Sequence, residues 1–376
     1  MSLELDIFES PDAELCKQYW EIGSDGEFCH SVKQISENHD ISSSKLLKKV
    51  RSNCHAYSTT IFCNSCSEPY VYKSRSDYQR LQSRNAFITC DNCLRDIKQD
   101  EELNKINAIQ SFIDSIDFKL SIDNLSVRQA VFLYALIRHS ANENLTGLDE
   151  FGLAKTELFS PDKDYNYHIL KELHDQRIIL ISPESNLDHI TLLDNGGVQY
   201  YIERVKWILP LKETYQNMNQ FINELDYVIT SLNYIDKAYD DVVELCKEVN
   251  LHECIGYLQH TLYEHQLNFN PGKKTILVLS KALEQYSVAQ VYNLIWAAVN
   301  NAAAYFMRSH VSKKQAANSV VGNIERRIEK SEANNWELKS FRRLFDLPQS
   351  QISRVLFNLL LHTDDGGFNL CSQDYI

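Results

Sequence analysis

Glycine and proline are scarce in this sequence, and no stretch of it is low in complexity. There are 11 Gly and 7 Pro among 376 residues, against 20 Tyr and 16 Phe. Few turn residues and many large apolar side chains are typical of an ordered, mostly helical chain, which excludes the disordered and collagen-like classes. At this length we expect two to four domains, each with its own core.

Export and membrane signals are also missing. The first twenty residues lack the basic start and apolar run of a signal peptide. The most apolar helix candidate, 288–307, is interrupted by three asparagines, which predicts a buried core helix and not a membrane span. Ten cysteines in a long chain without an export signal do not indicate a disulfide framework. We therefore expect a cytoplasmic protein with no membrane partner.

The common catalytic motifs are absent as well. No HExxH, GxSxG, GxGxxG or complete phosphate-loop motif occurs in the sequence. His252, His260 and His265 fall in one helical region without clear ligand spacing. We nominate no catalytic residue, and an enzyme of unrecognised fold, nuclease-like in type, is the weakest of three interpretations.

The strongest positive signal is a pair of CxxC motifs separated by 23 residues. Their members are Cys63, Cys66, Cys90 and Cys93. This spacing predicts a closed four-thiolate site for one structural zinc ion per chain. Short strands expected at 70–72 and 87–89 would connect the two motifs, so the segment resembles a zinc ribbon. Cys54 and His55 are alternative ligands, although Cys54 is better interpreted as a small buried apolar residue.

The net charge of −13 argues against indiscriminate coating of nucleic acid. Two basic islands interrupt the acidic chain, however. Segment 41–90 holds eight basic and two acidic residues, and segment 308–354 holds ten basic and five acidic residues. Each island indicates either local contact with a polyanion or a solvated surface.

The first island overlaps a helix-turn-helix pattern at 28–57. A short helix containing Val32 and Ile35, a turn at 38–40, and a second helix capped by Ser42 or Ser43 are expected there. The segment resembles helix-turn-helix DNA-binding domains, except that the turn lacks the usual glycine. The resemblance implies major-groove contacts from the second helix. The candidate DNA-binding residues are Ser44, Lys45, Lys48, Lys49 and Arg51. An ordinary helical hairpin is the alternative.

The C-terminal two thirds reads as helical with one winged-helix-like region. Helices at 126–139, 149–158 and 162–175, followed by a hairpin of 177–183 with 188–193, predict a winged helix with an acidic third helix suited to protein contact. Apolar spacing predicts further helices from residue 218 to the end. Segment 342–356 suggests either a second helix-turn-helix, with Gln349, Gln351 and Arg354 outward, or a surface helix capping the bundle.

Together these patterns predict a mainly α, multidomain protein. The expected division is 1–60 helix-turn-helix-like, 61–97 zinc ribbon, 98–210 linker helix and winged-helix-like domain, and 211–376 helical domain. We expect a zinc-containing protein that binds double-stranded DNA through the N-terminal module. It would act as a regulator or as a DNA-sensing component of a bacterial mobile-element or anti-phage system. The C-terminal half would bind a protein partner or form a homodimer. The main alternative is a protein-interaction adaptor with structural zinc and no DNA contact.

Overall fold

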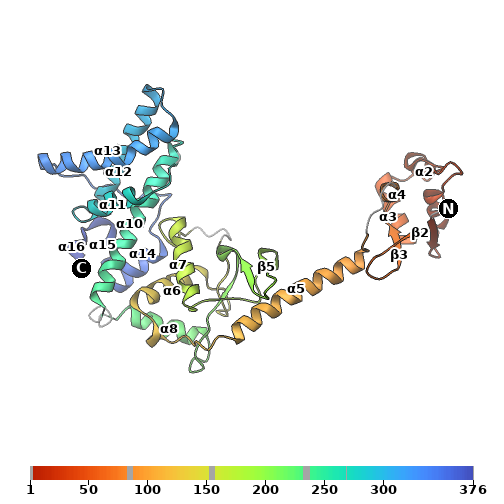
Figure 1. Cartoon of the computed structure of the whole chain (residues 1–376), viewed down its shortest axis with the longest axis horizontal. Coiled ribbons are helices and arrows are strands. Elements are labelled where there is room, and N and C mark those ends of the chain that lie inside the picture. Colours follow the sequence, from red (N-terminus) through yellow and green to blue (C-terminus); the bar gives the residue numbers. More distant parts are fainter. Residues whose placement is uncertain (1–2, 83–87, 152–156, 232–237, 268, 376) are drawn as a thin grey trace. The chain divides into compact units, whose positions relative to one another are not determined.

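The computed structural model describes residues 3–82, 88–151, 157–231, 238–267 and 269–375 (Figure 1). The chain is mainly helical with a few short strands, which confirms the predicted class. It divides into two compact units, Met1–Asn104 and Lys105–Ile376, here called the N-terminal and C-terminal units.

The N-terminal unit combines a small antiparallel sheet with short helices. Its strands follow the order β1-β2-β3, with Leu5 opposite Ala56 and Tyr57 opposite Val71. Helix α5 begins in this unit and continues past its boundary. The elements are β1 (Leu3–Ile7), α1 (Ala13–Trp20), α2 (Val32–Asn38), α3 (Ser43–Asn53), β2 (Cys54–Phe62), β3 (Pro69–Tyr72), α4 (Arg75–Gln82) and α5 (Asp91–Asp114).

One aromatic-rich core holds the N-terminal unit together. Tyr19 from α1, Ile35 from α2, Leu46 from α3 and Tyr72 from β3 are all buried in it. Elements on both sides of residue 60 therefore share a single core.

The C-terminal unit is built mostly from long helices. Its helices are η1 (Ile122–Asn124), α6 (Val127–Ser140), α7 (Lys163–Asp175), η2 (Leu187–His189), η3 (Ile202–Arg204), α8 (Met218–Ile229), α10 (Tyr239–Glu264), α11 (Lys273–Leu283), α12 (Val288–Arg308), α13 (Lys313–Asn334), α14 (Gln351–Ser353), the π-helix η4 (Arg354–Leu360), α15 (Gly366–Asn369) and α16 (Ser372–Tyr375). Its short strands are β4 (Leu180–Ile181), β5 (Ile190–Leu192), β6 (Val198–Tyr200) and β7 (Trp207–Ile208).

These strands pair differently from the predicted hairpin. β4 pairs with β7 and β5 pairs with β6, both antiparallel, so 177–183 and 188–193 do not pair with each other. Leu180 and Ile181 are buried, and their partners arrive from beyond residue 206, where local sequence gives no signal. Residues 152–156 of the expected helix at 149–158 lie outside the described residues, and its residues 149–151 and 157–158 are not helical.

Two apolar clusters form the core of the C-terminal unit. The first surrounds α6, and the second surrounds α12, whose Val291, Ile295 and Ala302 are buried, as the apolar spacing predicted. Among the described helices, none combines the length and the apolar character that a membrane crossing needs.

The structure of segment 342–356 contradicts the predicted second helix-turn-helix. Gln351 and Ile352 are buried, and Gln351 Nε2 donates to the Glu157 carboxylate. Arg354 also contacts Glu157, at 3.6 Å. Residues 341–344 have no regular secondary structure, so no first helix precedes α14. The segment is part of the core because its apolar side chains continue through Val355, Leu356 and Phe357.

Candidate metal centre and basic helix

The four CxxC cysteines gather at one point of the N-terminal unit. The Sγ atoms of Cys63, Cys66, Cys90 and Cys93 all lie within 4.8 Å of one another. Those of Cys66 and Cys90 are 3.8 Å apart. A zinc ion 2.3 Å from four sulfurs at tetrahedral angles requires sulfur separations of about 3.8 Å. The cluster could therefore hold a metal ion with little rearrangement, and within the described part of the chain no other such cluster forms.

The first cysteine pair lies in a tight turn after β2. Ser67 N–H donates to the Cys63 carbonyl at 2.9 Å, and Cys63 N–H donates to the Glu68 carbonyl at 2.8 Å. Ser67 has a φ of 60°, the left-handed conformation that lets the chain reverse here. The turn directs both sulfurs to one side.

The second pair is attached to a helix instead of a strand. Cys90 precedes α5, Cys93 lies in its first turn, and Leu94 N–H donates to the Cys90 carbonyl at 2.9 Å. Of the strand expected at 87–89, Phe87 lies outside the described residues, and Ile88 and Thr89 are not in a strand. Asp91 favours the helix because an acidic side chain in the first turn interacts well with the helix dipole.

Backbone groups from both turns converge on Cys63. Its sulfur accepts N–H groups from Ser65 at 3.4 Å and from Cys90 at 3.2 Å. Donation from the Cys66 and Cys90 backbones lowers the pKa of the Cys63 thiol to about 6, because these dipoles stabilise the thiolate. Hydrogen bonds to the sulfurs of Cys90 and Cys66 raise the pKa of Cys93. A bound cation would relieve the repulsion among four thiolates held this close.

Cys54 lies outside the cluster. It is buried in the core, and burial raises the pKa of its thiol. It therefore behaves as a small apolar residue, and the metal cluster does not include it.

Helix α3 carries the candidate DNA-binding residues. Ser42 caps it, accepting from Lys45 N–H at 3.3 Å, while Leu46 and Val50 enter the core. The turn before α3 contains Asp40 at a φ of 48°, so an aspartate takes the left-handed position that glycine usually occupies. The side chains exposed on α3 are Ser43, Ser44, Lys45, Lys48, Arg51 and Ser52.

The other basic residues of the first island are mostly held by neighbours. Lys49 pairs with Asp12 at 2.6 Å, and Arg80 pairs with Asp77 at 2.8 Å. Arg75 is buried between the rings of Tyr19 and Phe28. Lys73 pairs with Asp91 at 2.6 Å, and Arg84 lies outside the described residues. The island therefore contributes Lys45, Lys48 and Arg51 as exposed cations on one helix.

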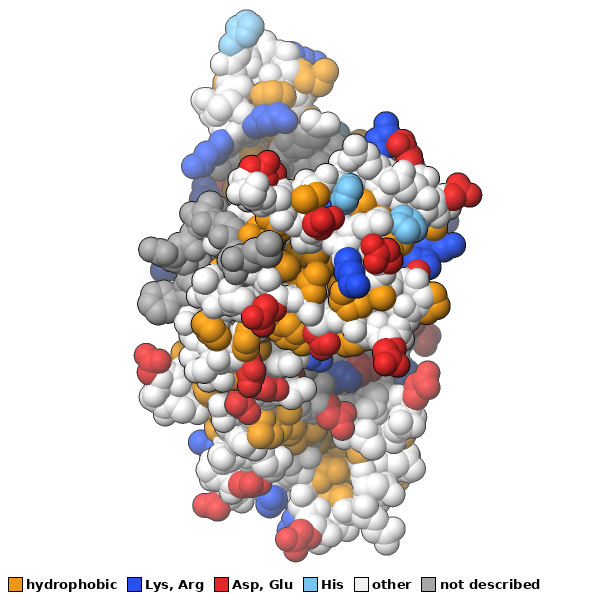
Figure 2. All heavy atoms as spheres, turned by 90° about the vertical axis from the view of Figure 1, so that its right-hand side faces the viewer, with side chains coloured by type: hydrophobic (Ala, Val, Ile, Leu, Met, Phe, Trp, Pro, Cys, Tyr) orange, Lys and Arg blue, Asp and Glu red, His pale blue; other side chains and the backbone are white. Residues whose placement is uncertain are grey.

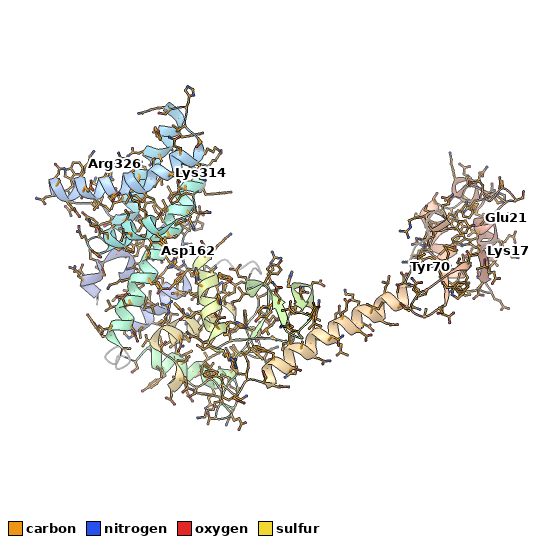
Figure 3. The ribbon with its side chains drawn as sticks, viewed as in Figure 1. Lys17, Glu21, Tyr70, Asp162, Lys314 and Arg326 are labelled. Carbon is orange, nitrogen blue, oxygen red and sulfur yellow. The ribbon has the colours of Figure 1, made fainter. Side chains whose placement is uncertain are left out.

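The C-terminal unit contains buried charge clusters that sequence patterns did not reveal. Asp162 Oδ2 and His252 Nδ1 are 2.5 Å apart, and the His252 ring stacks on Tyr165. Asp162 also caps α7 by accepting from Tyr165 N–H at 3.0 Å. The cap could be predicted from the sequence, but its histidine partner lies 90 residues away. Figure 3 labels Asp162, which ties α7 to α10.

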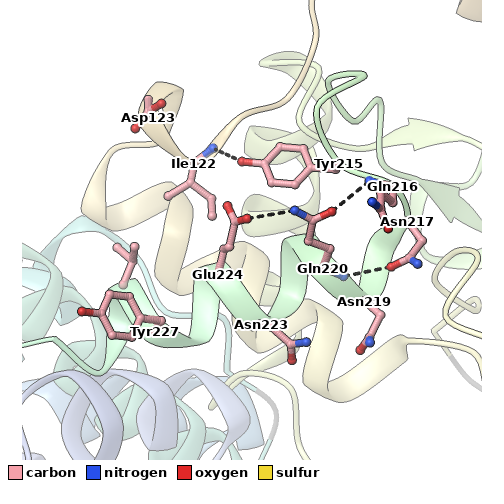
Figure 4. A pocket seen from close by; sticks show the side chains of 11 residues that line it. Ile122, Asp123, Tyr215, Gln216, Asn217, Asn219, Gln220, Asn223, Glu224 and Tyr227 are labelled. Carbon is pink, nitrogen blue, oxygen red and sulfur yellow. Dashed lines mark hydrogen bonds between the residues drawn. The ribbon is translucent and has the colours of Figure 1, made fainter.

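The C-terminal unit also has an open polar groove of about 640 Å³ between η1 and α8 (Figure 4). Amide side chains line much of it, and several bond to their own helix: Gln220 N–H donates to Asn217 and the Gln220 amide donates to Glu224 at 3.2 Å. No described residue there forms a metal-binding cluster. We therefore assign it no chemistry.

Comparison of the chain with protein-family models, curated proteins and solved structures found no match. The four-sulfur cluster and the exposed cations of α3 are thus the features from which a function can be argued.

Proposed function

We propose that the N-terminal unit is a zinc-dependent module that binds double-stranded DNA, with α2 and α3 acting as a helix-turn-helix. Four thiolates in a closed tetrahedral arrangement favour zinc over hard cations such as Mg²⁺ and Ca²⁺, which prefer oxygen ligands. Because all four positions would be occupied by protein, the ion would stabilise the unit and would not catalyse a reaction.

The main support for this proposal is a series of polar contacts that connects the sulfur cluster to α3. Arg51 Nε donates to the Lys73 carbonyl at 3.2 Å. The Lys73 ammonium pairs with Asp91 at 2.6 Å, and Asp91 lies between Cys90 and Cys93. A metal that fixes the second cysteine pair would therefore also fix the position of Arg51.

The exposed face of α3 fits a DNA backbone and its groove edges. Lys45 and Lys48 project from the N-terminal half of the helix, with Arg51 one turn further on. Lysine and arginine supply phosphate contacts, and arginine and serine can also contact base edges. Lys49 would contribute less than its neighbours because Asp12 already neutralises it.

The test is removal and return of the metal in the full chain. Elemental analysis should find one zinc per chain. Chelation should weaken duplex affinity in fluorescence anisotropy, and added Zn²⁺, but not Mg²⁺, should restore it. A chain that binds duplex DNA equally well with and without zinc would contradict the proposed coupling.

In this proposal the C-terminal unit supplies contacts to a protein partner or to a second copy. The wing of its winged-helix-like region would be the β5–β6 hairpin. Helix α7 of that region carries Asp164, Glu172 and Asp175. Glu172 pairs with Arg128 and Asp175 with Lys171, so the helix offers little attraction to a phosphate backbone. Such a protein would serve as a regulator or as a DNA-sensing component of a bacterial mobile-element or anti-phage system.

A protein-interaction adaptor is the second candidate, and the charge of the N-terminal unit favours it. Residues 1–104 contain 12 basic and 17 acidic residues, and Lys49, Lys73 and Arg80 pair with carboxylates. An adaptor would keep its zinc but show no salt-dependent duplex binding. Zinc content and DNA affinity therefore separate the two candidates.

A further inference from the structure

The C-terminal unit contains a long stretch without any acidic residue. From residue 288 to residue 324 there is no Asp or Glu, although the whole chain has 51. This stretch covers α12, the turn after it and the first half of α13. Its residues 308–324 belong to the second basic island, which the proposed DNA-binding helix α3 does not use.

Large apolar side chains are exposed where α12 ends. Tyr305 is 39% exposed, Phe306 36% and Met307 84%. Arg308 follows them, and it has no ion pair among the described residues. Three exposed apolar side chains therefore come directly before a cation in the sequence.

A pocket of about 510 Å³ lies at the start of α13, which begins five residues after α12 ends. It is lined by Phe269, Asn270, Lys313, Lys314 and Asn318, and no acidic residue contributes to it. Figure 3 labels Lys314 near the start of α13 and Arg326 further along the same helix. Both lysines are exposed and, among the described residues, form no ion pair. The volume falls in the range of small-ligand sites.

We propose that this pocket and the adjoining end of α12 bind single-stranded nucleic acid, with a nucleotide seated in the pocket. Lys313 and Lys314 contact phosphates. Asn270 and Asn318 each offer a donor and an acceptor to a base edge, and Phe269 offers a ring for stacking. Tyr305 and Phe306 stack on neighbouring bases. A duplex fits less well, because its bases are already stacked on one another.

This surface is separate from α3, so it goes beyond the proposed duplex-binding function. The two proposals fail independently. Variants of Lys45 and Lys48 should impair duplex binding only, and variants of Lys313 and Lys314 should impair single-strand binding only.

The test uses the full chain and a labelled 15-nucleotide oligothymidine in fluorescence anisotropy. Replacing Lys313→Glu and Lys314→Glu together should weaken binding about tenfold or more and lower the salt slope by about 1.4, because two phosphate contacts are lost. The control with equal charge change, Lys212→Glu with Lys281→Glu, should leave the slope unchanged. Thermal unfolding should be the same for both double variants.

A second pair of variants tests the contribution of the Phe306 ring to binding. Phe306→Ala should weaken oligothymidine binding about tenfold, and Phe306→Trp should restore it, since only a stacking surface is needed. Oligothymidine that does not bind, or that binds both lysine variants equally, overturns the proposal. So does binding of phosphatidylserine vesicles or polyglutamate with the same lysine dependence and no oligonucleotide binding, which would assign the patch to a membrane or an acidic protein.

Discussion

Cys63 is the most buried of the four clustered cysteines, and its sulfur accepts backbone N–H groups from both cysteine-bearing turns. Such hydrogen bonds hold a thiolate in place before any metal arrives and fix its orientation afterwards. The cluster is therefore built into the backbone of the N-terminal unit as well as into its side chains.

Replacing Cys63→Ser or Cys90→Ser should remove the zinc, because a structural tetrahedral site needs all four ligands. Elemental analysis should fall from one zinc per chain to nearly none, and the N-terminal unit should lose about 4 kcal/mol or more of stability. Cys29→Ser, at an exposed cysteine, and Cys54→Ala, at a buried one, serve as controls. If either control lost its zinc as completely as Cys63→Ser, the ligand assignment would be wrong.

Arg75 is a basic residue of the first island that stabilises the core and is not available to bind a ligand. Its guanidinium donates to the carbonyls of Gln18, at 3.2 Å, and Tyr19, at 2.5 Å, and to that of His30. Its carbon lies 4.5 Å and 4.4 Å from the ring centres of Tyr19 and Phe28. The side chain joins α4 to α1 and to the loop that follows α1.

Arg75→Ala should therefore destabilise the N-terminal unit by about 2–4 kcal/mol, because it removes a charged donor from three carbonyls and also removes two cation–π contacts. Chemical denaturation monitored by tryptophan fluorescence would measure the change. Arg80→Ala, at an exposed arginine of the same helix, should cost less than about 0.5 kcal/mol. Equal effects of the two variants would refute this role for Arg75.

At the scale of elements, local sequence predicted helices, whereas it did not predict which strands pair with each other. Ser42, Ser126, Asp162 and Ser287 all cap helices, as serine and aspartate before an apolar repeat indicate. β4, in contrast, pairs with β7, whose sequence lies more than 20 residues further on. Such nonlocal pairing depends on tertiary contacts that apolar spacing does not encode.

At the cysteine site, too, one feature could be predicted from the sequence and another was not. Ligand spacing alone predicted which four residues meet, because two CxxC pairs have few other uses. It did not predict that the second pair starts a helix. The sequence around Cys93 contains the signal for a helix: Asp91 is an acidic residue in the first turn, and Lys98 pairs with Glu102 one turn further along α5.

The last turn of α7 contains His174, whose protonation is disfavoured by burial. His174 Nε2 lies 2.6 Å from the Tyr200 hydroxyl, and its ring packs beside Trp207. Burial lowers the pKa of His174; Asp175 opposes this shift in part, and Lys171 adds a smaller lowering effect. The folded unit therefore disfavours the protonated ring.

The free energy of unfolding of the C-terminal unit should consequently fall as the pH drops below about 6.5, the ordinary histidine pKa. Above that pH both states are neutral and His174 contributes nothing; below it the unfolded chain binds a proton that the folded chain resists. His174→Gln should lose less stability between pH 7.5 and pH 5.5 than the unaltered chain in urea denaturation. A stability difference that does not change with pH would contradict this expectation.

At the scale of the whole molecule, the net charge of −13 hides local differences. Figure 2 shows acidic and basic side chains interspersed on the face that it displays, with apolar areas between them. Within the N-terminal unit, neutralisation by Asp12, Asp77 and Asp91 reduces the first basic island to a few cations on α3. Such a protein would contact DNA at a limited site, with an affinity that depends strongly on salt.

The proposed DNA-binding function therefore depends on whether the exposed cations of α3 contact a duplex. Salt-dependent duplex binding should be measured for the full, zinc-loaded chain and for Lys45→Glu with Lys48→Glu. The control, Lys17→Glu with Lys98→Glu, makes the same charge change at exposed lysines outside α2 and α3. We predict that the first variant lowers the salt slope by about 1.8, the loss of two phosphate contacts, while the control leaves it unchanged. An unchanged affinity and slope in the first variant would contradict the assignment of α3 to DNA.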